Sequence, residues 1–330
     1  MNPKKILIIG PSWLGDMVIA QKLFKTIKDI YPNSKLHVAS PAWTIPLVSR
    51  MPEVDQSISL PFSHGELNIL KRYQIAKVLR LEGYSQAIVL TNSFKSALIP
   101  FFAGIPKRTG FLGEMRFALI NDCIKKDSSL YRTVDQFLAL APKSKNTKVS
   151  LSTSIISKPS QGKRILAGKL SRLKKVLGIA PGAEYGESKR WPIEYFADVA
   201  NEAIQNGWEV ISLGSTNDQD LGRTLDRLTK NKVINLIGKT KLGEVIDVIS
   251  LCQSFLSNDS GLMHVAASLN IKQVAIFGSS DPKKTPPLSR HAKLAYLGLS
   301  CSPCFERVCP LQHTNCLKNI RPSEIIKKLI

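Results

Sequence analysis

The chain has 330 residues, of which 43% are hydrophobic and 22% are charged, a globular composition with room for two domains of ordinary size. Its 46 Lys and Arg against 25 Asp and Glu leave a net charge of +21, which suits nucleic acid, an acidic membrane surface or a phosphorylated substrate, although a basic solvated surface explains it equally well. The stretch SALIPFFAGI (96–105) is too short to span a bilayer.

The N-terminal segment MNPKKILIIGPSWLGD looks like a signal peptide only superficially. Its apolar run is broken by Gly10 and Pro11 and ends at Asp16 without a small-residue cleavage site. We predict a first strand here, and a cytoplasmic protein.

Short apolar, β-branched runs alternate with helical patterns along the chain. Strands are predicted at 5–9, 36–39, 87–90, 175–179, 209–213, 232–236, 254–257 and 273–277, and helices include 192–205, 218–228 and 242–251. This alternation predicts an α/β fold with parallel sheets covered on both faces.

A segment rich in Ser, Pro and Gly, residues 150–164, interrupts this alternation. After it, KKVLGIAPGAEYG repeats the strand and glycine turn of KKILIIGPSWLG. We therefore predict two doubly wound domains, 1–155 and 156–330, rather than one large sheet with an insertion. Ligands of such folds bind at the carboxyl ends of the strands, so the motifs below are expected to face the cleft between the domains.

The first glycine turn has the spacing of a phosphate-binding loop but the wrong chemistry. Asp16 and Met17 follow Gly15, where that loop requires Lys and then Ser or Thr. A carboxylate at a helix N-terminus stays ionised. Asp16 is therefore either a base that faces a hydroxyl, or a first-turn acid that only stabilises the helix.

Three predicted strand ends in the second half carry groups suited to a nucleoside diphosphate. In NDSGLMHVAASL, Asp259, Ser260 and Gly261 open a helix, with His264 one turn in, and exposed N–H groups there bind anions. Routine capping and a packed histidine are the alternative. GAEYGESKRWP supplies Lys189, and LGSTNDQD supplies Asp218 as a ribose acceptor or a helix cap. A nicotinamide dehydrogenase is disfavoured because neither half has Gly-x-Gly-x-x-Gly.

Four of the six cysteines lie in CSPCFERVCPLQHTNC, at 301, 304, 309 and 316. The first spacing suits a metal knuckle, but the later spacings match no standard zinc ribbon. Structural zinc, an iron–sulfur site and reduced thiols stay open, with a local structural site favoured over catalytic use. The cluster residues are Cys301, Cys304, Cys309 and Cys316.

At this point the motifs GPSWLGDMVIAQ, RMPEVD, NSFKSALIPFFAGIPKRTGF, PGAEYGESKRWP and NDSGLMHVAA together resemble the ADP-heptose:lipopolysaccharide heptosyltransferases of glycosyltransferase family 9, type II, over nearly the whole chain. The resemblance implies a GT-B fold, with an N-terminal acceptor domain and a C-terminal ADP-heptose domain that carries the cysteine cluster and a final helix. It also implies metal-independent, inverting transfer of L-glycero-D-manno-heptose to the first heptose of the inner core, by a monomer in peripheral contact with the inner face of the inner membrane.

The resemblance assigns roles residue by residue. Asp16 becomes the base, with Gly15 leaving the approach open, and Lys189 with the Ser260–Gly261 amides and His264 stabilises the departing ADP. Asp259 matches an aspartate near the sugar. Asp218 stands where type I enzymes have a glutamate for ribose, a contact that its shorter side chain puts in doubt. The other expected donor contacts are Gly182, Ala183 and Thr240, and the expected acceptor contacts, with solvated surface as the alternative, are Lys95, Arg108 and Arg116.

Two alternatives remain. A nucleic-acid-binding protein would suit the charge, but the sequence has no helix-turn-helix, RNP-type or zinc-finger motif, so no nucleic acid is expected. A transferase of the same fold that uses another sugar nucleotide is compatible with the residues.

Overall fold

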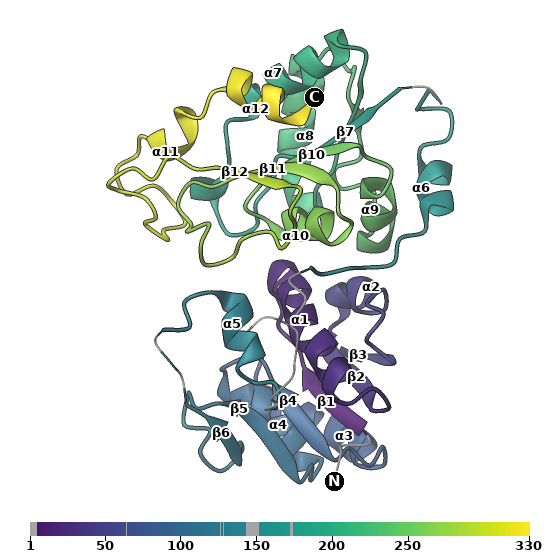
Figure 1. Cartoon of the computed structure of the whole chain (residues 1–330), viewed down its shortest axis with the longest axis vertical. Helices are drawn as coiled ribbons and strands as arrows, with labels where there is room; N and C mark the ends of the chain where they lie inside the picture. The colour runs from purple at the N-terminus through teal and green to yellow at the C-terminus, as the bar shows by residue number, and fades with distance from the viewer. Residues whose placement is uncertain (1–4, 64, 126, 128, 143–151, 172–173) are drawn as a thin grey trace. The chain divides into compact units, whose positions relative to one another are not determined.

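The computed structural model describes residues 5–63, 65–125, 127, 129–142, 152–171 and 174–330. The chain divides into two compact units, Met1–Thr153 and Ser154–Ile330, next to the boundary expected near residue 155. Each unit is built on its own sheet (Figure 1). The units are therefore described one at a time.

Unit 1 is a six-stranded sheet in the order β3-β2-β1-β4-β5-β6, with every paired strand parallel. Its strands are β1 (Lys5–Ile9), β2 (Lys35–Pro41), β3 (Gln56–Leu60), β4 (Gln86–Val89), β5 (Lys107–Phe111) and β6 (Asp122–Ile124). Its helices are α1 (Leu14–Ile30), η1 (Ala42–Thr44), α2 (Ile45–Val48), α3 (Ile69–Arg80), α4 (Phe94–Phe102) and α5 (Thr133–Leu138). α1 packs against α5, and α3 packs against α4.

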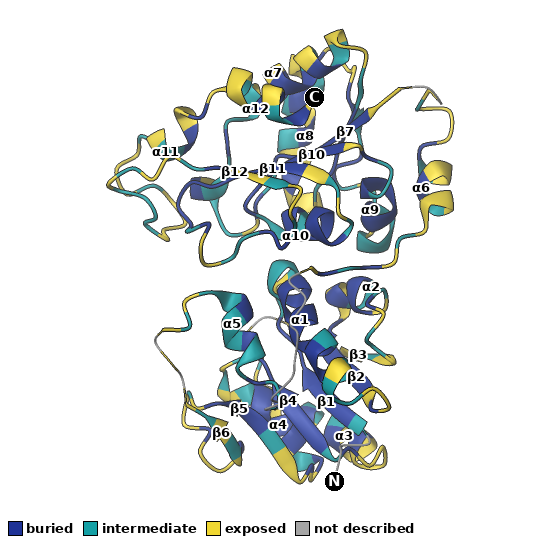
Figure 2. Ribbon diagram, viewed as in Figure 1, coloured by how far each residue is buried: buried dark blue, intermediate teal, exposed yellow. Residues whose placement is uncertain are grey.

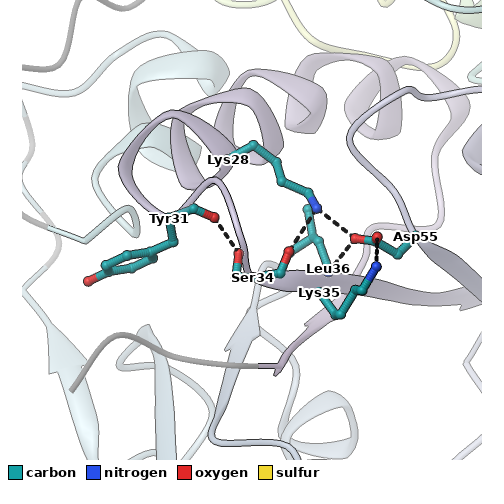
Figure 3. Close-up of polar contacts among 6 residues, drawn as sticks. All are labelled: Lys28, Tyr31, Ser34, Lys35, Leu36 and Asp55. Carbon is teal, nitrogen blue, oxygen red and sulfur yellow. Dashed lines mark hydrogen bonds and ion pairs between the residues drawn. The ribbon is translucent and has the colours of Figure 1, made fainter.

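Asp55, the last residue of the RMPEVD motif, fastens three segments of unit 1 (Figure 3). Its carboxylate accepts hydrogen bonds from Lys28 Nζ at 2.6 Å, Lys35 Nζ at 3.2 Å and the backbone N–H of Leu36 at 2.8 Å. Burial alone would raise the pKa of Asp55, but these three donors together lower it to about 2. The motif aspartate is thus a structural tie between the end of α1 and the starts of β2 and β3.

Unit 2 repeats this architecture with the order β12-β11-β10-β7-β8-β9, again parallel throughout. Its strands are β7 (Val176–Ala180), β8 (Glu209–Ser212), β9 (Ile234–Asn235), β10 (Ser254–Asn258), β11 (Lys272–Ile276) and β12 (Ala292–Ala295). Its helices are α6 (Pro159–Ile165), η2 (Glu187–Lys189), α7 (Ile193–Gln205), η3 (Thr216–Asp218), α8 (Gln219–Leu228), α9 (Leu242–Ile249), α10 (Gly261–Ser268), α11 (Asn315–Lys318) and α12 (Pro322–Leu329). α7 and α12 cover one face of the sheet and α9 and α10 the other (Figure 1).

β7 and β10, at the centre of the unit 2 sheet, are buried along their whole length (Figure 2). β7 is accordingly apolar throughout, whereas β10 also carries Ser254, Ser257 and Asn258. Trp191 anchors the core between sheet and helices, with its ring against Phe196 and Tyr195. Its indole N–H donates to the carbonyl of Ile320 at 3.1 Å, which ties the C-terminal segment to this core.

The predicted α/β fold is confirmed, and all eight predicted strands are present with bounds that agree or differ by at most two residues. Four strands were missed, β3, β5, β6 and β12. Three of them, β3, β6 and β12, close the edges of the sheets, where polar and exposed residues replace the apolar run. β5 was missed because it begins with Lys107 and Arg108, so it does not read as a continuous apolar run.

In each sheet the first strand of the unit has the next two strands on one side and the fourth on the other. This reversal makes a topological switch point, between β1 and β4 in unit 1 and between β7 and β10 in unit 2. Crevices at the carboxyl ends of such strand pairs are where open α/β sheets bind their ligands. Among the described residues, no helix combines the length and apolar character needed to cross a membrane.

Candidate functional site

The predicted donor residues of unit 2 gather around its switch point. Gly182 and Ala183 follow β7, Asp259 and Ser260 follow β10, and Asp218 follows β8. Because the strands are parallel, these chain segments all leave the sheet on the side where the strands have their carboxyl ends, which is called the carboxyl edge below. Sequence reasoning placed each segment at a strand end, and the sheet order brings them together.

Lys189 and Asp259 form an ion pair at the centre of the carboxyl edge. Lys189 Nζ lies 2.5 Å from Asp259 Oδ2, and the Ser280 hydroxyl donates to the same oxygen at 2.6 Å. The side chains of Lys189 and Asp259 are 17% and 6% exposed, so the pair is largely withdrawn from water. Within the described chain Asp259 Oδ1 accepts no hydrogen bond, which leaves it available to a hydroxyl donor.

The N-terminus of α10 stands directly beside this pair. Ser260 is its N-cap and Gly261 its first residue. The Ser260 hydroxyl oxygen is buried and has no hydrogen-bond partner among the described residues, and it does not cap its own helix. An unpaired buried hydroxyl beside helix N–H groups is a site that an anion would satisfy.

His264, one turn into α10, is 4% exposed. Burial lowers the pKa of its imidazole to about 4, an effect that Asp259 opposes and Lys189 reinforces. The ring is therefore neutral at physiological pH. It offers one N–H donor without a charge, which is a weaker role toward a phosphate than a cation would have.

Asp218 caps the start of η3, which was one of the two roles that the sequence allowed for it. Its Oδ2 accepts the backbone N–H of Ser215 at 2.9 Å and the Ser215 hydroxyl at 2.8 Å. Arg190 lies 3.8 Å from Oδ1, and a Cβ on Gly182 would collide with the carboxyl group. The capping interpretation is thus observed, and only Oδ1 is left for a ribose hydroxyl.

Two further expected donor residues lie at the carboxyl edge. Ala183 is buried and its carbonyl accepts from Arg190 Nε at 3.3 Å. Thr240 follows β9, half-buried, with its hydroxyl 3.4 Å from the carbonyl of Leu236. Their contacts with a nucleotide stay predictions.

In unit 1, Gly15 and Asp16 occupy the first turn of α1, and both are half-buried. The turn before them packs closely, because a Cβ on Gly10 would come within 2.6 Å of Met17 Cε and would force that side chain to move. Asp16 therefore stands at the carboxyl end of β1, beside the switch point of its own sheet.

The expectation for Arg116 is corrected by the structure. This side chain is fully buried, and its guanidinium donates to the carbonyls of Thr91, at 2.6 Å, and Phe111. Burial lowers the pKa of Arg116, although Glu114 opposes the effect. It is neither solvated surface nor accessible to an acceptor, but a tie between loops.

The side chain of Arg108 also donates its hydrogen bonds to main-chain carbonyls. In β5 it donates to the carbonyls of Leu119 at 2.7 Å and Ile105 at 2.6 Å, so its expected acceptor contact would require those bonds to be exchanged. Lys95, in the first turn of α4, is half-buried and remains the candidate cation of this motif.

The four clustered cysteines are free thiols, each half-buried. Burial raises the pKa of Cys316, and the negative charges of Cys301, Cys304 and Cys309 add to this effect, so the four side chains lie within electrostatic reach. Backbone N–H groups, that of Thr314 foremost, lower the pKa of Cys309. No three His, Cys, Asp or Glu side chains in the described part of the chain are arranged to hold a metal ion. Structural zinc, an iron–sulfur site and reduced thiols all stay open for this cluster.

Sequence reasoning missed Ser280, Arg190 and Ser215. Ser280 follows β11, so its place at a strand end was the available signal. Arg190 is adjacent to Lys189 in the same motif, and Ser215 precedes η3 as its N-cap.

Comparison with known proteins identifies the family of this chain. The family model described as glycosyltransferase family 9 (heptosyltransferase) matches residues 72–315. The chain is similar to lipopolysaccharide heptosyltransferase 2 of Escherichia coli strain K12, with 42% identity over 89% of this chain and 88% of that protein. It is 40% identical to lipooligosaccharide heptosyltransferase 2 of Haemophilus influenzae, over 88% of each chain. The solved structure of E. coli ADP-heptose lps heptosyltransferase II superposes with a TM-score of 0.86 and 36% identity, over 98% of this chain and 97% of that one.

Proposed function

We propose that this chain, which belongs to glycosyltransferase family 9, the heptosyltransferases, transfers L-glycero-D-manno-heptose from ADP-heptose to the first heptose of the lipopolysaccharide inner core. Support comes from the relatives named heptosyltransferase 2, which align with nearly the whole chain. The carrying observation in the structure is the Lys189–Asp259 pair beside the unpaired Ser260 hydroxyl at the N-terminus of α10.

The reaction is a single displacement that inverts the anomeric carbon. The acceptor oxygen attacks this carbon as the bond to the β-phosphate oxygen breaks, and the electron pair of that bond leaves with ADP. Asp16 accepts the proton of the acceptor hydroxyl, since a first-turn carboxylate is held ionised by the helix dipole.

The charge that develops on ADP is met by groups of unit 2. Lys189 gives one N–H to Asp259 and keeps two for phosphate oxygens. The Ser260 hydroxyl and the first N–H groups of α10 add neutral donors, and His264 adds an uncharged one. Asp259 Oδ1 is suited to a sugar hydroxyl. In this proposal cationic and dipolar groups do the work, and no cofactor takes part.

The test of the base is the substitution Asp16→Asn. It keeps the shape of the side chain, so donor binding and melting temperature should change little, whereas turnover should fall by about 10²–10⁴-fold. Asp29→Asn is the matched control, because Asp29 is an exposed carboxylate on the same helix, at its far end. Turnover of the Asp16 variant within a few-fold of the wild type would remove Asp16 from the mechanism. A panel of sugar nucleotides, assayed by product mass, separates ADP-heptose from another donor.

We also propose that the chain acts as a monomer in peripheral contact with the inner membrane, through the exposed face of α3. Leu70 and Val78 are 77% and 65% exposed, and Leu81, just past the helix, is 88% exposed. Their spacing puts them on one side of α3 together with the exposed Lys77. Apolar side chains flanked by lysine suit an anionic bilayer surface.

This contact is tested by sedimentation with phosphatidylcholine vesicles that contain or lack phosphatidylglycerol. The double variant Leu70→Gln, Val78→Gln should bind the anionic vesicles less. A control pair in unit 2, Val308→Gln with Leu311→Gln, replaces side chains that are 66% and 57% exposed and should bind like wild type. Equal binding by both variants would count against the α3 face, and light scattering gives the oligomeric state.

A further inference from the structure

The segment that carries the cysteines is fastened to the loop that carries Lys189. The Tyr185 hydroxyl donates to the carbonyl of Phe305 at 2.5 Å, and the backbone N–H of Ser188 donates to the carbonyl of Arg307 at 3.1 Å. Gly186 sits under this contact, because a Cβ there would collide with the Arg307 carbonyl. Residues 305–307 are therefore part of the wall behind the donor site.

Ser188 and Ser279 are the buried centre of this contact. They are 3% and 1% exposed, and their hydroxyls lie 2.9 Å apart. The Ser188 hydroxyl also contacts the carbonyl of Glu306, while the carbonyl of Ser279 accepts the N–H of Phe305 at 2.7 Å. The two serines thus join three segments: the loop after β7, the loop after β11 and the cysteine-bearing segment.

The residues that follow these two serines meet on one atom. Lys189 comes directly after Ser188, and Ser280 directly after Ser279. Lys189 Nζ and the Ser280 hydroxyl both contact Oδ2 of Asp259, at 2.5 and 2.6 Å. The hydrogen bond between the side chains of Ser188 and Ser279 holds the two loops together one residue before Lys189 and Ser280, and no other hydroxyl among the described residues joins these loops.

The packing around the pair leaves little freedom. A Cβ on Gly278 would approach the side chain of Leu317 to 2.7 Å and the Ser188 carbonyl oxygen to 3.0 Å. The Ser302 hydroxyl donates to the Gly278 carbonyl at 2.5 Å. The loop after β11 is therefore held from both sides at the residue before Ser279.

We infer that Ser188 and Ser279 form a positioning pair, which holds Lys189 and Ser280 on Asp259 and so sets the geometry of the diphosphate site. The inference rests on the proposed function, since it takes Lys189 as the phosphate ligand. It also gives the cysteine-bearing segment a role in donor binding, because the Glu306 carbonyl is the third partner of the pair.

The test compares Ser188→Ala, Ser279→Ala and the double variant with Ser254→Ala. Ser254 is 1% exposed and donates to the carbonyl of Leu329 at 2.6 Å. It lies at the start of β10, at the end of the strand opposite to Asp259, so it matches the loss of a buried hydroxyl away from the site. ADP affinity is measured by calorimetry, Michaelis constants for donor and acceptor by initial rates, and folding by thermal unfolding.

Each single variant should weaken ADP binding and raise the donor Michaelis constant by about 3- to 10-fold, the worth of one hydrogen bond. The acceptor constant should stay unchanged. The double variant should be little worse than the worse single one, because both substitutions remove the same bond. Ser254→Ala should lower the melting temperature and leave ADP binding within twofold of wild type.

ADP affinity of both single variants within twofold of wild type would overturn the inference. An equal loss in Ser254→Ala would also overturn it, since the effect would then be one of general stability. If Ser188→Ala does not fold, Ser279→Ala decides, because it leaves Ser188 bonded to the Glu306 carbonyl. A wild-type protein that binds no ADP would instead overturn the proposed function, and this inference with it.

Discussion

Replacement of Lys189 by Ala should separate binding from stability in a measurable way. The ammonium lies 2.5 Å from Asp259 and 4.9 Å from the ring centroid of Tyr185. Loss of a charge-assisted hydrogen bond to phosphate is worth about 1.5–3 kcal/mol, so ADP should bind about 10- to 100-fold more weakly.

The same substitution leaves a carboxylate that is 6% exposed with Ser280 as its remaining donor. Breaking a fully buried ion pair costs about 3–5 kcal/mol. Because Lys189 itself is 17% exposed, the loss here should be smaller, about 2 kcal/mol. Addition of Asp259→Asn removes the unpaired charge, so the double variant should recover stability without recovering ADP affinity.

Calorimetry with ADP, together with thermal unfolding of the same preparations, measures both effects. Lys175→Ala is the control for net charge, since Lys175 precedes β7 at the opposite end of the sheet and lies over the ring of Trp208. It should bind ADP like wild type. Unchanged ADP affinity in Lys189→Ala, or recovery of affinity in the double variant, would refute the assignment of Lys189 to the phosphate.

Three further predictions concern metal, pH and thiols. Dialysis against EDTA should leave transfer within about twofold of its starting rate, since cationic and helix-end groups serve the diphosphate; a loss that Mg²⁺ restores but Zn²⁺ does not would contradict this, and metal analysis of the purified protein tests the cysteines. The pKa of His264 is lowered to about 4 in the folded chain. As pH falls below about 6.5, this histidine therefore becomes protonated in the unfolded chain while it stays neutral in the folded one. The unfolding free energy should then drop by about 1.4 kcal/mol per pH unit down to about pH 4, and calorimetric scans of His264→Gln should show a shallower decline; equal slopes would refute it. Iodoacetamide should label Cys309 before Cys252, because backbone N–H groups lower the pKa of Cys309 whereas burial raises that of Cys252 to about 12; protection of Cys309 until a chelator is added would indicate a bound metal instead.

The sequence was informative wherever one local pattern decides the structure. Apart from Lys5, β1 and β7 are continuous apolar runs because both faces of each sheet are covered. Lys189 and Asp259 were each found because each follows a predicted strand. Their contact at 2.5 Å, and the arrival of Ser280 at the same oxygen, depend on which strands become neighbours, and no local pattern records that.

The burial of Arg116 could not be predicted from the sequence. Arg116 lies in a segment rich in glycine and charge, which predicts exposure, yet it is fully buried. A guanidinium is buried when main-chain carbonyls surround its donors, and here they come from Thr91 and Phe111, in different parts of unit 1. The fold supplies those acceptors. The charge of Arg116 alone would therefore place it on the surface.

Each unit places a carboxylate near the start of a helix at its switch point, Asp16 in the first turn of α1 and Asp259 just before α10. Their chemistry differs because of what surrounds them. Two donors within 2.6 Å occupy Oδ2 of Asp259, so this carboxylate holds Lys189 in place and offers only Oδ1 to a sugar hydroxyl. A proton acceptor that must engage and release a hydroxyl proton is poorly served by an oxygen already held twice. We therefore propose Asp16 as the base, and we propose that Asp259 holds the Lys189 cation beside the N-terminus of α10.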